Sequence, residues 1–327
     1  MPRVFSGIQP SGELHIGNYL GAVKNWVQLQ DRYECIYCIV DYHAITGSYE
    51  PEELRQRTRD MAVSLLAAGL DPDKCTLFVQ SMVPEHTELA WIFNTVTPLG
   101  ELERQTQFKD KASRQESVVA GVLNYPVLQA ADILLYLADL VPVGEDQVQH
   151  LELTRVIARR WNAQYGRDED FFPEPQPLLT PARRIMGLDG QAKMSKSMGN
   201  TIGLLEAPEA IWAKLRPAVT DPARIKRTDP GTPEVCNIYH LHKTLSEPAT
   251  VATVAYNCSH AQWGCIDCKR VLFESMEREL VPIRRRAAEL AARPDEVREA
   301  LADGTRRCAA RARETMRGVK ARMGFES

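Results

Sequence analysis

Strand-like and helix-like stretches alternate along the first half of the chain, and this alternation limits the possible folds more than any other feature. RVFSGI, ECIYCIV, CTLFVQS and DLVPVG are rich in Val, Ile, Phe and Tyr, which is the composition of strands. The stretches between them, such as PEELRQRTRDMAVSLLAAG and PVLQAADILLYLA, repeat apolar residues every three to four positions, as helices do. The pattern predicts an α/β fold whose parallel sheet binds ligands beyond the carboxyl ends of its strands.

The pattern changes in the second half of the chain. Residues 166–192 are dense in proline and glycine, which predicts a loop and a domain boundary. After residue 204 the strand signals vanish, and the chain ends in two long helical patterns, CKRVLFESMERELVPIRRRAAELAARP and PDEVREALADGTRRCAARARETMRG. A length of 327 residues suits two domains. The second domain is therefore predicted to be all-helical.

Composition narrows the possible classes of function. The net charge of −3 gives no overall basic field, so contact with nucleic acid must come from local patches. Lys214, Arg216, Arg224, Lys226 and Arg227 are candidates, although a solvated surface is the simpler explanation for each one. No apolar run reaches the ~18 residues of a membrane span, and the N-terminus lacks the basic and apolar regions of a signal peptide. We therefore expect a cytoplasmic protein with no membrane contact.

Two short motifs suggest phosphate chemistry. SGIQPSGELHIGN, residues 6–18, places a Gly- and Pro-rich turn between a strand and a helix, where backbone N–H groups and the helix start favour phosphates. Taken alone, residues 6–18 are explained equally well by a tight turn that binds no ligand. KMSKS, residues 193–197, is either a solvated charged surface or a mobile loop whose ammonium groups neutralise a polyphosphate as it breaks.

Together the two motifs resemble the signatures of a known family. HIGN resembles the "HIGH" signature of the class I aminoacyl-tRNA synthetases, and KMSKS matches their second signature. The resemblance continues through DYHAIT, YPVLQAADILLY and VPVGEDQVQHLELTR, which are similar to the tryptophanyl branch, and it covers nearly the whole chain. It implies an enzyme that activates L-tryptophan with ATP and Mg²⁺, transfers it to tRNA(Trp), and forms a homodimer.

The resemblance also implies roles for individual residues. The ATP site would comprise Gln9, Pro10, Ser11, Gly17, Asn18, Gly144, Glu145, Asp146, Ile185, Lys193, Met194, Ser195, Lys196 and Ser197. The residues implied in catalysis are Gln9, His15, Asn18, Lys111, Lys193 and Lys196. Asn18 replaces the second histidine of the usual signature, and its amide can still donate a hydrogen bond. Lys109 is an alternative to Lys111.

Asp132 is the candidate that residue chemistry itself suggests for reading the amino acid. It lies on an otherwise apolar helix, where a buried carboxylate needs a hydrogen-bond donor, and an indole N–H is such a donor. The alternatives are a helix cap or a pair with an arginine. The resemblance adds further tryptophan-binding residues: Phe5, Gly7, His43, Tyr125, Gln129, Val141, Val143 and Gln147. Gln129 departs from the family, which usually has methionine there, and His150 is expected to be structural.

Four cysteines form a third candidate site. A C-x-x-C pair at a helix start, Cys265 and Cys268, has Cys236 and Cys258 in the same predicted domain, which suggests a four-thiolate metal site that suits zinc or an iron–sulfur cluster equally. Buried free thiols are the alternative. His240, His242 and His260 keep a mixed cysteine–histidine zinc site open. Some tryptophanyl enzymes carry a [4Fe–4S] cluster on a similar spacing, so the resemblance favours that cluster, with Zn²⁺ second.

Cys35 and Cys38 also read C-x-x-C, but they lie in a predicted strand, where positions three apart face opposite ways. We therefore do not expect them to bind metal, nor Cys75 or Cys308.

These expectations combine into one organisation. Residues 1–188 would form a Rossmann-like catalytic domain, with a C-terminal helix at 293–327 packing back on it. Residues 189–292 would form a helical anticodon-binding domain that holds the four cysteines. Two other functions remain open: a tyrosine–tRNA ligase with the same fold, and a catalytically inactive RNA-binding relative.

Overall fold

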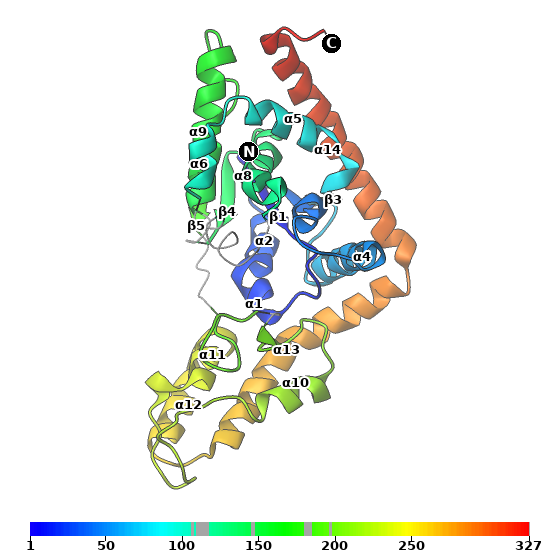
Figure 1. Cartoon of the computed structure of the whole chain (residues 1–327). Coiled ribbons are helices and arrows are strands. Elements are labelled where there is room, and N and C mark those ends of the chain that lie inside the picture. Colours follow the sequence, from blue (N-terminus) through cyan, green and yellow to red (C-terminus); the bar gives the residue numbers. More distant parts are fainter. Residues whose placement is uncertain (106–107, 109–117, 145–147, 180–184, 196–197, 327) are drawn as a thin grey trace. The chain divides into compact units, whose positions relative to one another are not determined.

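The fold is taken from a computed structural model, which describes residues 1–105, 108, 118–144, 148–179, 185–195 and 198–326. The chain forms two compact units. The first consists of Met1–Gly12, Asn25–Pro181 and Arg293–Ser327, and the second of Glu13–Lys24 and Ala182–Ala292. Thus a short segment near the N-terminus groups with residues from the second half of the chain (Figure 1).

A five-stranded parallel sheet forms the centre of the first unit. Its strands are β1 (Arg3–Ile8), β2 (Glu34–Ile39), β3 (Cys75–Val79), β4 (Leu140–Val143) and β5 (Gln176–Leu179). The spatial order is β3-β2-β1-β4-β5, and every neighbouring pair is parallel. Four of these strands fall where the apolar runs predict them. The predicted α/β class with a parallel sheet and a helical second domain is confirmed.

The fifth strand, β5, corrects the prediction of a loop over residues 166–192. Gln176–Leu179 lies at the edge of the sheet and pairs with β4 alone, with Pro177 opposite Val141. A proline has no N–H to donate to a neighbouring strand, so it is tolerated at an edge and gives no sign of a strand in the sequence.

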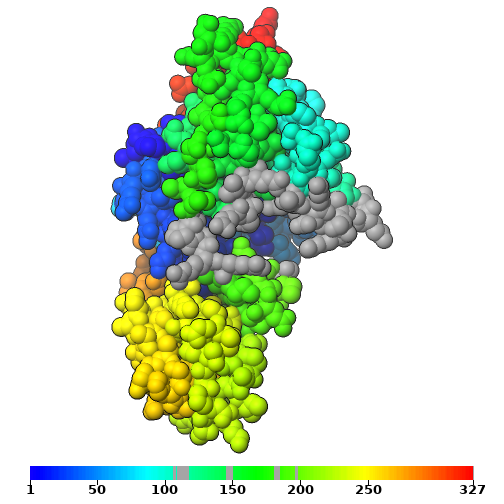
Figure 2. All heavy atoms as spheres, turned by 90° about the vertical axis from the view of Figure 1, so that its left-hand side faces the viewer, coloured from blue at the N-terminus to red at the C-terminus, as the bar shows by residue number. Residues whose placement is uncertain are grey.

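Helices surround this sheet. Those of the first unit are α2 (Lys24–Leu29), α3 (Asp41–Ala44), α4 (Pro51–Ala67), α5 (Glu85–Asn94), α6 (Leu99–Glu103), α8 (Ala120–Leu134), α9 (Val148–Tyr165) and α14 (Pro294–Met323), with the 3₁₀ turn η2 (Gln80–Met82). Helices α5 and α9 pack on α8, and Figure 2 shows α9, in green, on the surface of the unit. The aromatic core includes Trp161, Tyr136 and Phe93, all fully buried.

The C-terminal helix α14 packs on the backbone of β3. A Cβ atom added to Gly304 would lie 2.0 Å from the Leu77 carbonyl oxygen, so only glycine permits this approach. The first unit therefore contains the last helix of the chain as part of its core, with Cys308, Ala312 and Met316 buried.

The second unit is helical. It contains α1 (Ile16–Asn18), the π-helical turn η1 (Tyr19–Val23), α10 (Pro208–Leu215), the 3₁₀ turn η5 (Pro233–Val235), α11 (Asn237–Leu245), α12 (Pro248–Ser259) and α13 (Cys265–Ala291). The ammonium group of Lys269 on α13 is buried and donates to the carbonyl oxygens of Arg216, at 2.7 Å, and Ala218, at 2.6 Å, which joins α13 to the end of α10. Across the described residues, none of the helices combines the length and apolarity that crossing a bilayer requires.

Candidate active site

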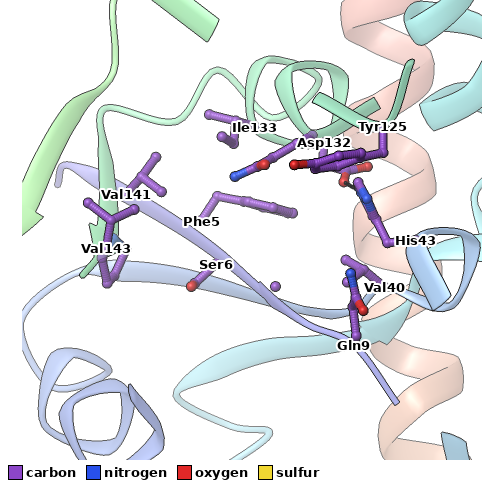
Figure 3. A pocket seen from close by; sticks show the side chains of 13 residues that line it. Phe5, Ser6, Gln9, Val40, His43, Tyr125, Asp132, Ile133, Val141 and Val143 are labelled. Carbon is purple, nitrogen blue, oxygen red and sulfur yellow. Dashed lines mark hydrogen bonds and ion pairs between the residues drawn. The ribbon is translucent and has the colours of Figure 1, made fainter. Parts of the chain in front are cut away.

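A cavity of about 270 Å³ opens in the first unit at the carboxyl ends of its strands. Its walls come from β1 and the following turn, the end of β2, α3, α8 and β4: Phe5, Ser6, Gly7, Gln9, Val40, His43, Tyr125, Gln129, Asp132, Ile133, Val141, Pro142 and Val143. Figure 3 shows Asp132, Tyr125 and His43 together at one side and Val141 and Val143 at the other, with Phe5 between them. The cavity thus combines an apolar wall with one polar end, as small-molecule sites do.

Asp132 is the centre of the polar end. The residue is 1% exposed, and its Oδ2 atom lies 2.7 Å from His43 Nε2. Its Oδ1 atom lies 2.6 Å from both Gln80 Nε2 and His86 Nδ1. The partners of this carboxylate are therefore two histidines and an amide, rather than the arginine or helix start considered from the sequence.

The surroundings of Asp132 keep it ionised. Burial alone would raise the pKa of its carboxyl group, but the charges and hydrogen bonds of His43 and His86 outweigh burial and hold that pKa well below its ordinary value. An ionised carboxylate only accepts hydrogen bonds. The cavity therefore offers an anionic acceptor at its polar end.

Gln80 and His86 were not predicted as site residues. Gln80 directly follows β3, where the carboxyl end of the strand brings it beside the site, and its Oε1 atom accepts from the Tyr42 backbone N–H at 3.1 Å. His86 lies in the first turn of α5 and is fully buried. The rule that ligands bind at the carboxyl ends of parallel strands points to the segment after β3, and this was the signal that could have found them.

The remaining wall is set by close packing. The Tyr125 hydroxyl and His150 Nε2 form a hydrogen bond of 3.1 Å, so His150, expected from the sequence to be structural, contacts a residue of the cavity wall. Burial raises the pKa of Tyr125 well above its ordinary value, so its hydroxyl keeps its proton. A Cβ atom on Gly7 would lie 2.8 Å from Val40 Cγ1, and this absence of a side chain leaves room at the end of β1. Gln129 lines the cavity and is half-buried.

The first signature lies in the second unit. His15 caps α1 by accepting from the Asn18 backbone N–H through Nδ1 at 3.3 Å, and Asn18 Oδ1 accepts from the His15 N–H at 3.3 Å. The asparagine that replaces the usual histidine therefore completes a reciprocal cap. The Ile16 N–H donates to the Ile202 carbonyl oxygen at 2.9 Å, and His15 forms a β-bridge with Gly203.

The second signature begins in the same unit. Lys193 is exposed and forms a bridge with Met186, while Met194 is buried and its N–H donates to the Ile185 carbonyl oxygen at 2.9 Å. The Ser195 N–H donates to Asn200 Oδ1 at 2.8 Å. The start of the motif is thus held by backbone contacts, and the Lys193 ammonium group extends to solvent.

The other predicted site residues divide between the two units. Gln9, Pro10, Ser11 and Gly144 belong to the first, whereas His15, Gly17, Asn18, Ile185, Lys193, Met194 and Ser195 belong to the second. Several predicted residues lie outside the described part of the chain: Lys111, Glu145, Asp146, Gln147, Lys196 and Ser197.

The four cysteines come together in the second unit. Burial, together with the neighbouring Cys236, Cys258 and Cys265, raises the pKa of Cys268 to about 12, so Cys268 interacts electrostatically with the other three. Cys268 Sγ lies 3.6 Å from His242 Nε2, whereas His240 Nε2 lies 2.9 Å from the Glu234 carbonyl oxygen.

Proximity does not amount to a formed metal site. Within the described residues, no group of three or more His, Cys, Asp or Glu side chains is arranged to hold a metal ion. The expectation of a [4Fe–4S] cluster or zinc is therefore not confirmed. Cys35, Cys38, Cys75 and Cys308, which were not expected to bind metal, are buried in the first unit.

The comparisons with known proteins agree on a family. Residues 1–281 match tRNA synthetases class I (W and Y). A tryptophan–tRNA ligase of Deinococcus radiodurans is 56% identical over 330 residues, which cover 99% of each chain. A tryptophanyl-tRNA synthetase of Campylobacter jejuni, solved in complex with ADP and tryptophan, is similar with a TM-score of 0.90 at 35% identity, covering 99% of this chain and 100% of that one.

A tyrosyl-tRNA synthetase of Archaeoglobus fulgidus, solved with L-tyrosine, is less similar. Its TM-score is 0.67 at 25% identity, and the match covers 88% of this chain and 90% of that one. The family match extends over most of the chain, and the relative from Deinococcus radiodurans is similar from end to end. The chain belongs to the class I aminoacyl-tRNA synthetases, in the family of the tryptophanyl and tyrosyl enzymes.

Proposed function

We propose that the chain is a tryptophan–tRNA ligase, which activates L-tryptophan with Mg-ATP and transfers it to tRNA(Trp). The observation that carries the proposal is the ionised Asp132 at the polar end of an otherwise apolar cavity. Indole is a large apolar ring with a single N–H donor, so it matches an apolar wall with one anionic acceptor. The similarity to tryptophan–tRNA ligases over the full length of the chain supports the same conclusion.

The cavity residues would bind the amino acid as follows. Asp132 accepts from the indole N–H, and Phe5, Val141 and Val143 enclose the ring. Tyr125, Gln147 and His43 hold the polar groups around the Cα atom. Gly7 leaves the space for the substrate at the end of β1, and Gln129 contacts the ring edge.

Activation joins tryptophan to AMP. A carboxylate oxygen of tryptophan attacks the α-phosphorus of ATP, the new O–P bond forms, and the bond to the β-phosphate oxygen breaks to release pyrophosphate. The carboxylate is already ionised, so the protein aligns the reactants and stabilises charge without a general base. Lys193, Lys196 and Lys111 neutralise the phosphates, and Mg²⁺ accompanies ATP.

The ATP site contains both signatures. Gln9, His15 and Asn18 would each act on the ATP phosphates, as would the lysines. The site further includes Pro10, Ser11, Gly17, Gly144, Glu145, Asp146, Ile185, Met194, Ser195 and Ser197. In the second step a terminal ribose hydroxyl of the tRNA attacks the adenylate carbonyl carbon and AMP leaves.

Pyrophosphate exchange tests the proposal. With radiolabelled pyrophosphate and ATP, we expect exchange that depends on tryptophan and is weaker by orders of magnitude with tyrosine. Exchange with tyrosine as the better substrate would indicate a tyrosine–tRNA ligase, since a phenol O–H is also a donor to Asp132. Absence of exchange with either amino acid would indicate an inactive relative.

The helical unit would bind the anticodon, with the four cysteines ordering it. A shared metal or cluster is supported by the proximity of Cys236, Cys258, Cys265 and Cys268, which interact with one another and are partly withdrawn from water, although the described side chains are not arranged as a formed metal site. A [4Fe–4S] cluster, or Zn²⁺ as the alternative, would supply a covalent cross-link among them. Anaerobic purification with metal analysis and a visible spectrum distinguishes iron, zinc and free thiols.

A paired substitution tests what the cysteines do. Cys265→Ser should lower tRNA charging more than adenylate formation, because the helical unit is the one proposed to contact tRNA. Cys308→Ser is the matched control, since Cys308 is a buried cysteine of the first unit, whereas the other four belong to the second. Equal losses of both steps in Cys265→Ser would contradict this role.

We further propose that the protein forms a homodimer. Large apolar side chains are exposed in η2, α5 and α6 and just before α8 of the first unit: Met82, Trp91, Leu99 and Val119. Trp91, the largest of these side chains, is 73% exposed and would bury a large apolar area in an interface. A partner subunit that covers this surface would account for it.

A further inference from the structure

The partners of Asp132 are distributed unequally between its two oxygen atoms. Oδ1 accepts from both Gln80 and His86, whereas Oδ2 has His43 alone among the described residues. A carboxylate oxygen has two lone pairs, so Oδ1 is saturated and Oδ2 keeps one acceptor position.

The cavity lies on the side of Oδ2. His43, the partner of Oδ2, lines the cavity, whereas Gln80 and His86 do not. The acceptor position that remains is therefore the one that an indole can reach. Rotation of the carboxylate about its Cβ–Cγ bond would break two hydrogen bonds of 2.6 Å, which keeps this orientation in place.

His86 is itself fixed. The ring is fully buried, it stacks on Phe78 with the centroids 5.7 Å apart, and its Nε2 atom lies 2.7 Å from the Tyr136 hydroxyl. Burial raises the pKa of Tyr136 well above its ordinary value, so the hydroxyl keeps its proton. Because ionised Asp132 has no proton to offer, the proton between Asp132 and His86 resides on Nδ1.

We propose that His86 is a positioning residue for indole recognition: with Gln80 it saturates Oδ1 of Asp132 and thereby presents Oδ2 to the substrate N–H. The inference rests on the proposed function and deepens it, because it identifies what makes the acceptor selective. Without His86, Oδ1 regains an open acceptor position and the carboxylate is free to turn. Selectivity for the N–H is then lost even where the apolar wall is intact.

A substrate pair isolates this role. Tryptophan is compared with β-(1-benzothiophen-3-yl)alanine, in which sulfur replaces the indole N–H and the shape is nearly unchanged. The readout is the ratio of kcat/KM values for the two in pyrophosphate exchange. A site built to hydrogen-bond a substrate N–H discriminates by about 10⁴-fold or more against an analogue that lacks it. A residue with a merely structural role would lower both values and leave the ratio unchanged.

His86→Leu removes the donor, and we expect the ratio to fall by about tenfold or more, mainly through the loss of tryptophan activity. His86→Asn restores the ratio, because the asparagine amide nitrogen is bonded to Cγ, as Nδ1 is in histidine, and can donate to Oδ1 in its place. Ile92→Ala, at a buried position of the same helix whose side chain has no hydrogen-bonding group, controls for destabilisation and keeps the ratio.

If His86→Leu does not fold, Gln80→Met gives the same information through the other donor to Oδ1. An unchanged ratio in the folded variants overturns the inference and leaves the ligase function standing. Failure of the unaltered chain to exchange pyrophosphate with tryptophan would instead overturn the proposed function.

Discussion

Replacing Asp132 with asparagine separates recognition of the indole from the shape of the cavity. An amide has one oxygen that accepts and one NH₂ group that donates. At the Oδ1 position two donors converge, and the Gln80 amide cannot turn because the Tyr42 N–H holds its oxygen. The asparagine oxygen therefore takes the Oδ1 position, and the NH₂ group takes the Oδ2 position.

The consequence at the substrate follows directly. His43 can accept from the new NH₂ group by changing its tautomer, but the indole N–H then faces a donor. A hydrogen bond to a charged group contributes about 1.5–3 kcal/mol, so we expect kcat/KM for tryptophan to fall about 10- to 100-fold. The benzothiophene analogue, which has no N–H, should be affected much less.

Pyrophosphate exchange with both substrates measures this, and a thermal melt checks that Asp132→Asn is folded. Gln129→Met is the matched control, because it alters the same cavity wall and leaves the Asp132 carboxylate unchanged in the chain. A kcat/KM for tryptophan within about threefold of the unaltered chain, a range found at uninvolved sites, would refute the assignment of Asp132.

Three further outcomes follow from other parts of the molecule. Because the pKa of Asp132 is lowered in the folded state, its ionised carboxylate should stabilise the fold above the unfolded pKa of about 3.9, and this stabilisation should disappear as the pH falls below that value. Free energies of unfolding of the unaltered chain and of Asp132→Asn, measured across this pH range, check the direction of the change. Gly304→Ala should destabilise the fold by about 1–3 kcal/mol in urea titrations, because its Cβ atom would meet the Leu77 carbonyl, whereas Gly100→Ala, with its nearest neighbour at 3.6 Å, should not. Trp91→Glu should shift the protein from dimer to monomer in light scattering, and an unchanged mass would place the interface elsewhere.

The sequence predicted the parts of the fold that depend on local pattern. Strands such as Arg3–Ile8 carry enough β-branched and aromatic residues to be located, and α13 begins at Cys265 as its C-x-x-C pair suggested. Gln176–Leu179 was missed because its pairing partner, not its composition, makes it a strand. An edge strand of four residues that contains a proline has little local signal.

In the candidate site, too, the sequence predicts what depends on local pattern and misses the contacts between distant residues. Burial of a lone carboxylate on an apolar helix is visible in the sequence, and Asp132 is 1% exposed. The identity of its partners is not visible, because His86 and Gln80 are separated from it by 46 and 52 positions. Periodicity reports which face of an element is buried, whereas contacts between elements depend on the order of strands in the sheet.

The grouping of Glu13–Lys24 with the second unit has a consequence for synthesis of the chain on the ribosome. Ile16 binds the carbonyl oxygen of Ile202, and Tyr19 and Lys24 bind Glu279. The ribosome synthesises about 5–20 residues per second, so Ile202 is added about 10–40 s after the segment that carries the first signature. Glu279 is added later still. During that time the signature helix has none of these partners, so its packing in the second unit is completed only after Glu279 has been synthesised.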